Sequence, residues 1–484
     1  MKKSAPYAVA FVAGAAAALG FTPGWFPVVL ASFALLVHLW LTSGRPAFWI
    51  GFAYGLGLYG VGVSWVYISM NRFGGLPAPV AALATLGLCA LLALFPALVG
   101  WAQARLPQSS GRPLAIPALW VLAEWLRAWF LTGFPWLALG YSALDTPLTG
   151  YAPLGGVHLV SLATATSAML LWLIAAGERR WLCAAAFALI GVAGAGLQSV
   201  EWTKAKGAPV SVSLLQGNIE QSLKFDPARY ERILEAYARL AEASRARLIV
   251  LPETAVPRFF DNVHPAFIAR LQAVALRNGG DLLLGVPVRP APGVYFNSVI
   301  SLGASPYSAY HKVHLVPFGE FVTPGFRWFV DAMSIPLADF SRGAPSQRPL
   351  AVAGERVAVN ICYEDAYGDE VVRQLPEATL LVNVSNVAWF GDSLAPGQHL
   401  QIARMRAIET GRMHLTATNT GITAAIGADG AVLARLPQFT ENKLEIEARG
   451  RTGATPYVAL VDGPALALSA LLLFFFAARG RRSG

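Results

Sequence analysis

The charged residues of this chain are distributed so unevenly that they limit the architectures it can adopt. Only twelve of the first 200 residues are Asp, Glu, Lys or Arg, and long apolar runs separate most of them. About 20 mostly apolar residues are enough for a helix to cross a bilayer. Runs of this kind cover residues 6–22, 25–41, 47–69, 78–103, 113–130, 156–176, 181–199 and 457–478. We therefore expect a polytopic α-helical membrane bundle with about eight spans.

The segment between the seventh and eighth apolar runs has a different composition. From residue 201 to residue 456, charged and polar residues occur as they do in ordinary α/β proteins. The change predicts three parts of the chain. Residues 1–200 hold spans one to seven, residues 201–456 form a folded domain, and residues 457–484 hold the eighth span and a basic tail.

The basic residues predict how the chain is oriented in the membrane. Cytoplasmic loops carry an excess of Lys and Arg, and this excess falls in alternate loops. It comprises Lys2, Lys3, Arg45, Arg105, Arg112, Arg179, Arg180, Arg479, Arg481 and Arg482, whereas Arg72 is the exception on the other side. Both termini are therefore expected in the cytoplasm and residues 201–456 on the outer side. The net charge of +9 does not indicate nucleic-acid binding, because the basic residues of that domain form no patch.

Two opposite charges lie inside the fifth apolar run. Glu124 and Arg127 are three residues apart, so they share a helix face and can pair. Ionisable residues within spans are rare and often functional. We expect a structural ion pair near the headgroup level, with a functional role as the alternative.

The outer domain alternates strand and helix patterns. Strands are expected at 210–215, 247–251, 281–286, 295–302, 307–313, 356–361 and 380–384, with hairpin-like strands over 414–435. Helices are expected at 228–243, 265–278, 369–374 and 397–412. This order predicts an α/β domain with helices over mixed sheets. We find neither a glycine-rich phosphate loop nor Cys/His spacing suited to a metal, so no cofactor is expected.

Three reactive residues sit at or just after expected strands of this domain. Glu253 follows one strand in Leu-Pro-Glu-Thr, Lys312 lies in Tyr-His-Lys-Val-His, and Cys362 follows another strand in Asn-Ile-Cys-Tyr-Glu-Asp. Residues at strand ends of an open α/β sheet tend to converge on one edge. Cys89 and Cys183 lie in apolar runs, and the three cysteines form no disulfide framework. A buried, inert thiol is the alternative interpretation of Cys362.

These three residue types form a coherent set for nucleophilic catalysis. A thiol has a pKa of about 8.5 and needs a base or a cation nearby to react as a thiolate. Glu253 can take the thiol proton and return it to a leaving group. Lys312 can stabilise the oxyanion of a tetrahedral intermediate, together with the backbone N–H that follows the nucleophile. The product of the first step is a thioester.

Longer strings around these residues carry a resemblance. The trio resembles the Glu–Lys–Cys triad of the nitrilase superfamily, and nearly the whole chain is similar to the apolipoprotein N-acyltransferase family. The most specific strings are Gln216-Gly217-Asn218-Ile219, His314-Leu315-Val316-Pro317-Phe318-Gly319-Glu320-Phe321, Cys362-Tyr363-Glu364 and Asn383-Val384-Ser385-Asn386 running to Asp392. The resemblance implies a nitrilase-like α-β-β-α sandwich inserted into the membrane bundle.

The resemblance also implies roles for residues outside the triad. Glu320 would orient Lys312 or support the base, and Tyr363 and Glu364 would shape the acyl site. The remaining residues around the cleft would be Asn297, Trp389 and Phe225. Two positions depart from the family's pattern, because Phe225 stands where Trp is common and Val387 where Asp is common. We expect retained activity with an altered fit of substrate.

The activity implied by the resemblance is acyl transfer between two lipids. The sn-1 acyl chain of a phospholipid would move to Cys362 and then, in a ping-pong reaction, to the α-amino group of the S-diacylglyceryl cysteine of an apolipoprotein. The enzyme would sit in the inner membrane with its catalytic domain in the periplasm. It would need no cofactor and no metal. Loops near 320–340 and 386–396 are candidate lids that keep water from the thioester.

Three other functions remain to be distinguished. A membrane-tethered amidase or nitrilase would use the same triad but release the acyl group to water. A transporter or channel with an outer accessory domain is disfavoured, because ionisable residues are scarce within the expected spans. A scaffold or receptor would leave the triad strings without a purpose.

Overall fold

The computed structural model describes residues 4–22, 25–107, 112–321 and 339–480, with side chains up to residue 476. Two compact units divide the chain. The first unit, here the helical unit, comprises Met1–Tyr67, Pro79–Glu201 and Thr455–Gly484, and the second, the sheet unit, comprises Ile68–Ala78 and Trp202–Ala454. The sheet unit therefore includes Ile68–Ala78, a short segment from the N-terminal part of the chain that ends where the long helix Ala78–Ala104 begins.

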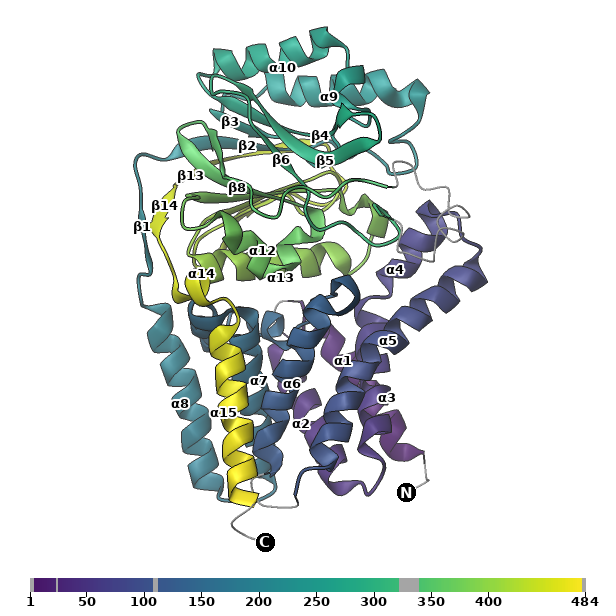
Figure 1. The fold of residues 1–484 in the computed structure, drawn as a ribbon, viewed down its shortest axis with the longest axis vertical. Helices are drawn as coiled ribbons and strands as arrows, with labels where there is room; N and C mark the ends of the chain where they lie inside the picture. The colour runs from purple at the N-terminus through teal and green to yellow at the C-terminus, as the bar shows by residue number, and fades with distance from the viewer. Residues whose placement is uncertain (1–3, 23–24, 108–111, 322–338, 481–484) are drawn as a thin grey trace. The chain divides into compact units, whose positions relative to one another are not determined.

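The helical unit is built from apolar helices (Figure 1). Four described helices are long and apolar enough to cross a membrane, and they cover Ala78–Ala104, Arg112–Thr132, Pro147–Ala175 and Arg180–Gln198. Ala47–Gly62 and Trp65–Phe73, bent by 51°, make a fifth candidate if they form one span. Three shorter apolar helices cover Ala5–Leu19, Phe26–Thr42 and Gly463–Phe476. By length and composition the described residues thus supply four or five candidate spans, and the expected count of about eight is not confirmed.

Small residues let some of these helices approach closely. A Cβ atom added to Gly14 of α1 (Ala5–Leu19) would lie 2.0 Å from the Tyr54 carbonyl oxygen of α3 (Ala47–Gly62). The same atom on Gly57 of α3 would lie 2.0 Å from the Phe11 carbonyl oxygen. Larger residues at either position would force the backbones apart, so glycine sets the spacing of this pair.

The prediction of an ion pair between Glu124 and Arg127 is wrong. Both side chains are buried in α6 (Arg112–Trp129), but each bonds to the loop after the helix. Glu124 Oε1 accepts from the Leu139 N–H at 2.7 Å, and Arg127 Nη1 donates to the Phe134 carbonyl at 2.6 Å. The loop brings backbone groups within reach of each charge, and these take the place of the partner three residues away.

The sheet unit contains two six-stranded mixed sheets. Their strand orders are β13-β2-β3-β4-β5-β6 and β12-β11-β10-β9-β8-β7. The bounds are β2 Val210–Gln216, β3 Leu248–Val250, β4 Asp281–Ala291, β5 Val294–Gly303, β6 Ala309–His311, β7 Leu350–Val352, β8 Glu355–Ile361, β9 Leu380–Ser385, β10 His414–Thr418, β11 Ala424–Ile426, β12 Val432–Arg435 and β13 Asn442–Ala448. Strands β2-β3-β4 and β8-β9-β10 are parallel, and antiparallel strands flank them.

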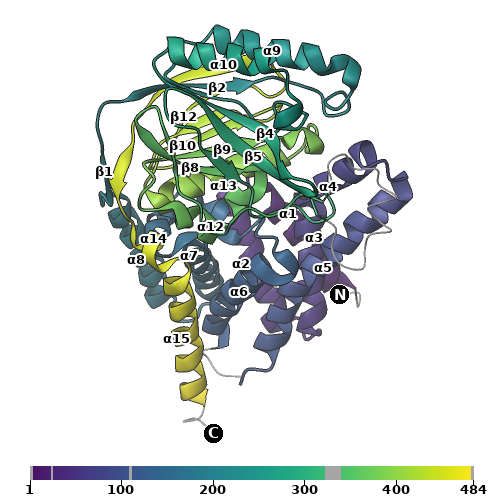
Figure 2. The same cartoon turned by 45° about the horizontal axis from the view of Figure 1, so that its top comes forward.

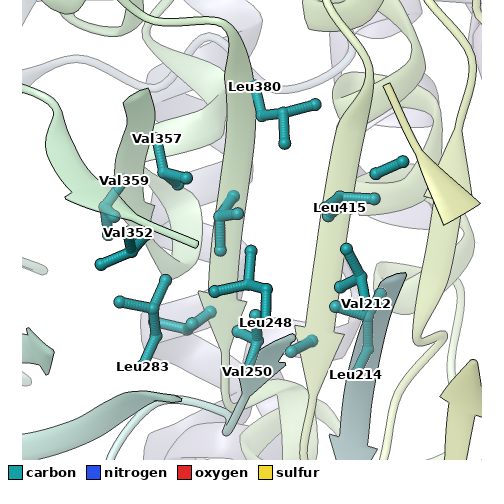
Figure 3. Packing of buried hydrophobic residues seen from close by; sticks show 14 of the residues in the cluster. Val212, Leu214, Leu248, Val250, Leu283, Val352, Val357, Val359, Leu380 and Leu415 are labelled. Atoms are coloured by element: carbon teal, nitrogen blue, oxygen red, sulfur yellow. The ribbon is translucent and has the colours of Figure 1, made fainter. Parts of the chain in front are cut away.

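The two sheets pack face to face and helices cover their outer faces. Val212, Leu248 and Leu283 of one sheet pack with Val357, Leu380 and Leu415 of the other (Figure 3). Helices α9 (Tyr230–Glu242) and α10 (Pro265–Arg277) cover the first sheet, and α12 (Gly368–Val371) and α13 (Ala395–Thr410) cover the second (Figure 2). Strands covered on both faces must be apolar on both faces, which explains the continuous apolar runs in their sequences. The result is an α-β-β-α sandwich, and the expected α/β class is confirmed.

Several details of the expected secondary structure differ from the structure, and β7 and β13 lie outside every expected strand. The strand expected at 307–313 is only β6, so Lys312 lies just beyond its end. The short strands β1 (Thr203–Ala205) and β14 (Arg451–Gly453) pair with each other and were not expected. Their three residues are mostly exposed, so no alternation of apolar and polar residues marks them.

Candidate active site

The three candidate catalytic residues lie just after strands of the two facing sheets. Glu253 follows β3, Lys312 directly follows β6, and Cys362 directly follows β8. Strands β3 and β6 belong to one sheet and β8 to the other. The site is therefore assembled from both halves of the sandwich, and strand ends bring together residues that are distant in sequence.

Cys362 is the first residue of a short helix, Cys362–Ala366, at the sharp turn that directly follows β8. Its φ of 59° is in the left-handed region, which costs a non-glycine residue about 1–3 kcal/mol. Asn383 Nδ2 holds the turn by donating to the Cys362 carbonyl at 2.8 Å. Burial raises the pKa of the thiol to about 12 and the Glu253 carboxylate adds to this, while the charge of Lys312 opposes it. The thiol therefore needs a base to react.

Glu253 is buried and receives hydrogen bonds at both carboxylate oxygens. Oε1 accepts from Asn297 Nδ2 at 2.7 Å and lies 3.3 Å from Lys312 Nζ, and Oε2 accepts from the Asn386 N–H at 2.9 Å. Burial by itself would raise the pKa of Glu253. The charge of Lys312, followed by the Asn297 bond, outweighs burial and lowers it. The carboxylate is thus ionised and able to take a proton.

Glu320 forms a second ion pair with the same lysine. Lys312 Nζ lies 2.9 Å from Glu320 Oε1, and the Val316 N–H donates to Glu320 Oε2 at 2.9 Å. Asn297 Nδ2 also donates to Glu320 Oε1, at 2.8 Å, so one amide group contacts both carboxylates. Burial would lower the pKa of Lys312, but Glu320 and Glu253 together raise it. The lysine remains an ammonium between two carboxylates.

Glu364 and Tyr363 connect the lysine segment to the cysteine turn. Glu364 accepts from the N–H groups of Val313, His314 and Ile361 at 2.7, 3.0 and 2.7 Å, and from the Tyr310 hydroxyl at 3.1 Å. Burial raises the pKa of Glu364 to about 7, with the charge of Lys312 opposing it. The Tyr363 hydroxyl donates to the Leu315 carbonyl at 2.7 Å. These bonds fix the backbone on both sides of the site.

Trp389 and Phe225 stand apart from this network. Both are half-buried, and neither bonds to or stacks on the triad side chains in the described part of the chain. Trp389, in the turn Val387–Phe390, makes an edge contact with Phe73 at 5.9 Å between ring centroids. Of the two expected lids, residues 322–338 of the 320–340 loop lie outside the described residues.

Several polar residues of the site escaped the sequence analysis. The Asn386 side chain donates to Gln221 Oε1 at 2.7 Å and accepts from Asn419 Nδ2 at 3.1 Å, while its N–H binds Glu253. Lys224 is buried and donates to the Glu253 carbonyl at 3.2 Å. Asn386 lies in one of the strings that carry the resemblance. Its hydrogen bond to Glu253 could not be predicted from the residue type, because the donor is a backbone N–H.

A second buried cluster lies beside the cysteine turn. Asp365 Oδ1 is 3.0 Å from His414 Nε2, and Asp365 Oδ2 is 3.6 Å from His399 Nε2. Within the ranges that the structure describes, no three His, Cys, Asp or Glu residues are grouped so as to hold a metal ion. Across the described site, the arrangement offers a thiol, a base and a cation rather than a ligand cage.

Comparison with known proteins relates both parts of the chain to described families. The model of the apolipoprotein N-acyltransferase N-terminal domain matches residues 13–170, and that of carbon-nitrogen hydrolase matches residues 211–457. An apolipoprotein N-acyltransferase of Nitrosomonas europaea is 48% identical over 96% of this chain and 95% of its own length. The protein of that name from Ralstonia nicotianae is 44% identical over 96% and 92%. A crystal structure of carbon-nitrogen hydrolase from Helicobacter pylori is 18% identical over 49% of this chain and 89% of that one, with a TM-score of 0.38.

Proposed function

Because the chain belongs to the apolipoprotein N-acyltransferase family, we propose that it acylates the N-terminus of lipoproteins through a thioester on Cys362. The acyl donor is the sn-1 chain of a phospholipid. The acceptor is the α-amino group of an S-diacylglyceryl cysteine. Glu253 is the general base and acid, Lys312 stabilises the oxyanion, and Cys362 is the nucleophile.

The first half-reaction loads the enzyme. Glu253 takes the proton of the Cys362 thiol, and the sulfur forms a bond to the sn-1 ester carbonyl. The resulting oxyanion is stabilised by Lys312 and the backbone N–H after the nucleophile. The bond from the carbonyl carbon to the glycerol oxygen then breaks, and Glu253 returns the proton to that oxygen. A lysophospholipid leaves and a thioester remains.

The second half-reaction unloads the enzyme by the same groups. The amine of the acceptor attacks the thioester carbonyl and gives a proton to Glu253. The carbon–sulfur bond breaks, and the Cys362 sulfur recovers the proton. The ester bond energy is kept in the thioester, so the proposed reaction needs neither a nucleotide nor a metal. One site serves both lipids in turn, which makes the reaction ping-pong.

The surface of the helical unit supports a membrane location for this chemistry. Large apolar side chains are exposed on it, among them Leu83 and Val192, each 70% exposed. Extensive exposed apolar surface marks contact with a membrane or partner. Together with the basic residues of alternate loops, this supports a membrane-embedded helical unit with cytoplasmic termini and a periplasmic sheet unit. Both lipid substrates would then reach the site from one leaflet.

The observation that carries the proposal is the contact between Glu253 and Lys312 beside the Cys362 turn. Lys312 Nζ is 3.3 Å from Glu253 Oε1, and the charges of both residues act on the thiol. A base and a cation acting on one half-buried thiol fit acyl transfer through sulfur. The inert-thiol alternative gives no reason for two buried charges next to Cys362.

The decisive experiment follows a labelled acyl chain. Purified full-length protein is incubated with phospholipid labelled in the sn-1 chain, and the peptide containing Cys362 is examined by mass spectrometry. We expect an added acyl mass that disappears when a diacylglyceryl peptide is supplied. Cys362→Ser should abolish the transfer while insertion into the membrane is kept. Release of free fatty acid without transfer to the peptide would support the amidase alternative, and substantial activity of the serine variant would exclude Cys362 as the nucleophile.

A further inference from the structure

Lys224 is a buried cation to which the proposed mechanism gives no role. It lies between β2 and α9, and only 2% of the residue is exposed. Its Nζ donates one hydrogen bond, to the Glu253 carbonyl at 3.2 Å. An ammonium has three N–H donors. No carboxylate lies within ion-pair distance of Lys224 among the residues that the structure describes, so Lys224 forms no salt bridge there.

The other lysine of the site is bound quite differently. Lys312 lies between two carboxylates, at 3.3 Å from Glu253 and 2.9 Å from Glu320. Its charge is therefore largely committed to these partners. Burial lowers the pKa of Lys224 to about 8, and the charges of Glu253 and Cys362 act in the opposite direction. Lys224 thus binds the main chain of the base, and its charge interacts with the charges of Glu253 and Cys362.

The charges of Glu253, Glu320 and Lys312 balance only when Lys224 is included, and any negative charge on the buried Glu364, whose pKa is raised to about 7, adds to the need for a second cation. Glu253 and Glu320 each carry one negative charge, and Lys312 carries one positive charge. Without Lys224 the group would be negative before the reaction begins, and the reaction adds a further negative charge at the sulfur or the oxyanion. In a poorly solvated site, a thiolate next to a net negative charge is strongly disfavoured.

We propose that Lys224 is a positioning residue whose positive charge lets Cys362 release its proton while the Glu253 carboxylate stays in place. The inference rests on the proposed function only in taking Cys362 as the nucleophile, and it is independent of the acyl donor. The proton passes from the sulfur to Glu253, so no further reactant is required. Lys224 acts through the charges of these two groups and forms no bond to substrate.

The test measures the reactivity of the thiol without any lipid. Full-length wild type and Lys224→Met are alkylated with iodoacetamide at pH values from 6 to 10, and the rate at Cys362 is obtained from peptide mass spectra. Lys206→Met, which removes an exposed lysine of the same unit, is the matched control. At pH 8 we expect Lys224→Met to react about tenfold more slowly than wild type, with its pH profile moved to higher pH by about one unit. The control should follow wild type.

A charge-preserving variant tests the same inference if Lys224→Met does not fold. Arginine keeps its charge throughout this pH range, whereas Lys224 loses its proton as the pH rises through about 8. Burial, the charges of Glu253, Lys312 and Glu320 and the Ser385 side chain also act on the thiol, and none of these groups is replaced in Lys224→Arg. The ratio of the Lys224→Arg rate to the wild-type rate should therefore rise about threefold or more between pH 7 and pH 10.

Each outcome bears on one proposal or the other. Lys224→Met with the wild-type profile, or parallel profiles of Lys224→Arg and wild type, would overturn the role of Lys224. If the profiles shift as expected but wild type moves no acyl chain from phospholipid, the role of Lys224 stands and the proposed acyl transfer falls.

Discussion

The two units of the molecule bury charges in different ways. In the helical unit, Glu124 and Arg127 bond to the backbone and to Trp120, and they hold the loop after α6 in place. In the sheet unit, Glu253, Lys312 and Glu320 bond to one another beside a thiol. Buried charges are tolerated only when they are hydrogen-bonded. In the first case the partners are mostly main-chain groups and the charges hold a loop, whereas in the second the partners are charges that act on a thiol.

The largest effect should come from removing the base in the sheet unit. Glu253→Gln keeps the shape of the side chain but cannot take the thiol proton, so we expect acyl transfer to fall by about 10²- to 10⁴-fold. The measurement is transfer of labelled acyl chain to a diacylglyceryl peptide. Glu441→Gln, at a surface carboxylate paired with Arg239, is the control and should keep nearly full activity. A Glu253→Gln enzyme within tenfold of wild type would show that another group is the base.

A smaller loss should follow from removing the amide that contacts both carboxylates. Asn297→Leu leaves Glu253 and Glu320 each without one hydrogen bond. Losing bonds to buried charged groups costs about 1–3 kcal/mol, so we expect acyl transfer to decrease about 10- to 100-fold. Asn442→Leu, at an exposed asparagine of β13, is the matched control. Full activity of Asn297→Leu would mean that Lys312 and the N–H groups of Asn386 and Val316 position the two carboxylates without the amide.

In the helical unit the same kind of change should affect stability rather than chemistry. Arg127→Met removes the guanidinium that donates to the Phe134 and Trp136 carbonyls. We expect the free energy of unfolding in detergent to fall by about 1–3 kcal/mol, with acyl transfer per folded molecule unchanged. Arg180→Met, at an exposed arginine of α8 (Arg180–Gln198), is the control. A large loss of transfer at unchanged stability would assign the buried arginine to the chemistry and remove the contrast between the units.

The sequence predicts those parts of the site that depend on residue type and strand position. Glu253, Lys312 and Cys362 could be found because each is a reactive residue at the end of a strand pattern, and strand ends converge. Glu320 and Asn297 followed from resemblance, and the structure places both in contact with Lys312 or Glu253. The α/β class followed from the alternation of apolar patterns.

The parts that could not be predicted depend on tertiary contacts. Helical spacing correctly places Glu124 and Arg127 on one face. It does not predict the loop after α6, whose backbone groups bond to both side chains. The burial of Lys224 depends on where its turn packs, which no local pattern records. Asn386 acts on Glu253 through its N–H, a group that every residue except proline carries.

The smallest effect on acyl transfer is expected from the aromatic contact between Phe73 and Trp389. Both residues belong to the sheet unit. Phe73 lies in the segment Ile68–Ala78, and its ring meets Trp389 at an interplanar angle of 85°. Edge-to-face aromatic pairs contribute about 0.5–1.5 kcal/mol beyond their buried area. Phe73→Leu and Trp389→Leu should each raise the phospholipid concentration at half-maximal rate about two- to tenfold, and leave alkylation of Cys362 unchanged.

The double variant determines whether the contact itself matters. If the two rings act as a pair, Phe73→Leu combined with Trp389→Leu should be little worse than either single variant, because the second substitution has no contact left to remove. Fully additive effects would mean that each ring acts separately. A change in alkylation of Cys362 would mean that the pair shapes the thiol site itself. Additive effects would contradict the role proposed for the contact, and altered alkylation would contradict the separation of this contact from the charged residues around Cys362.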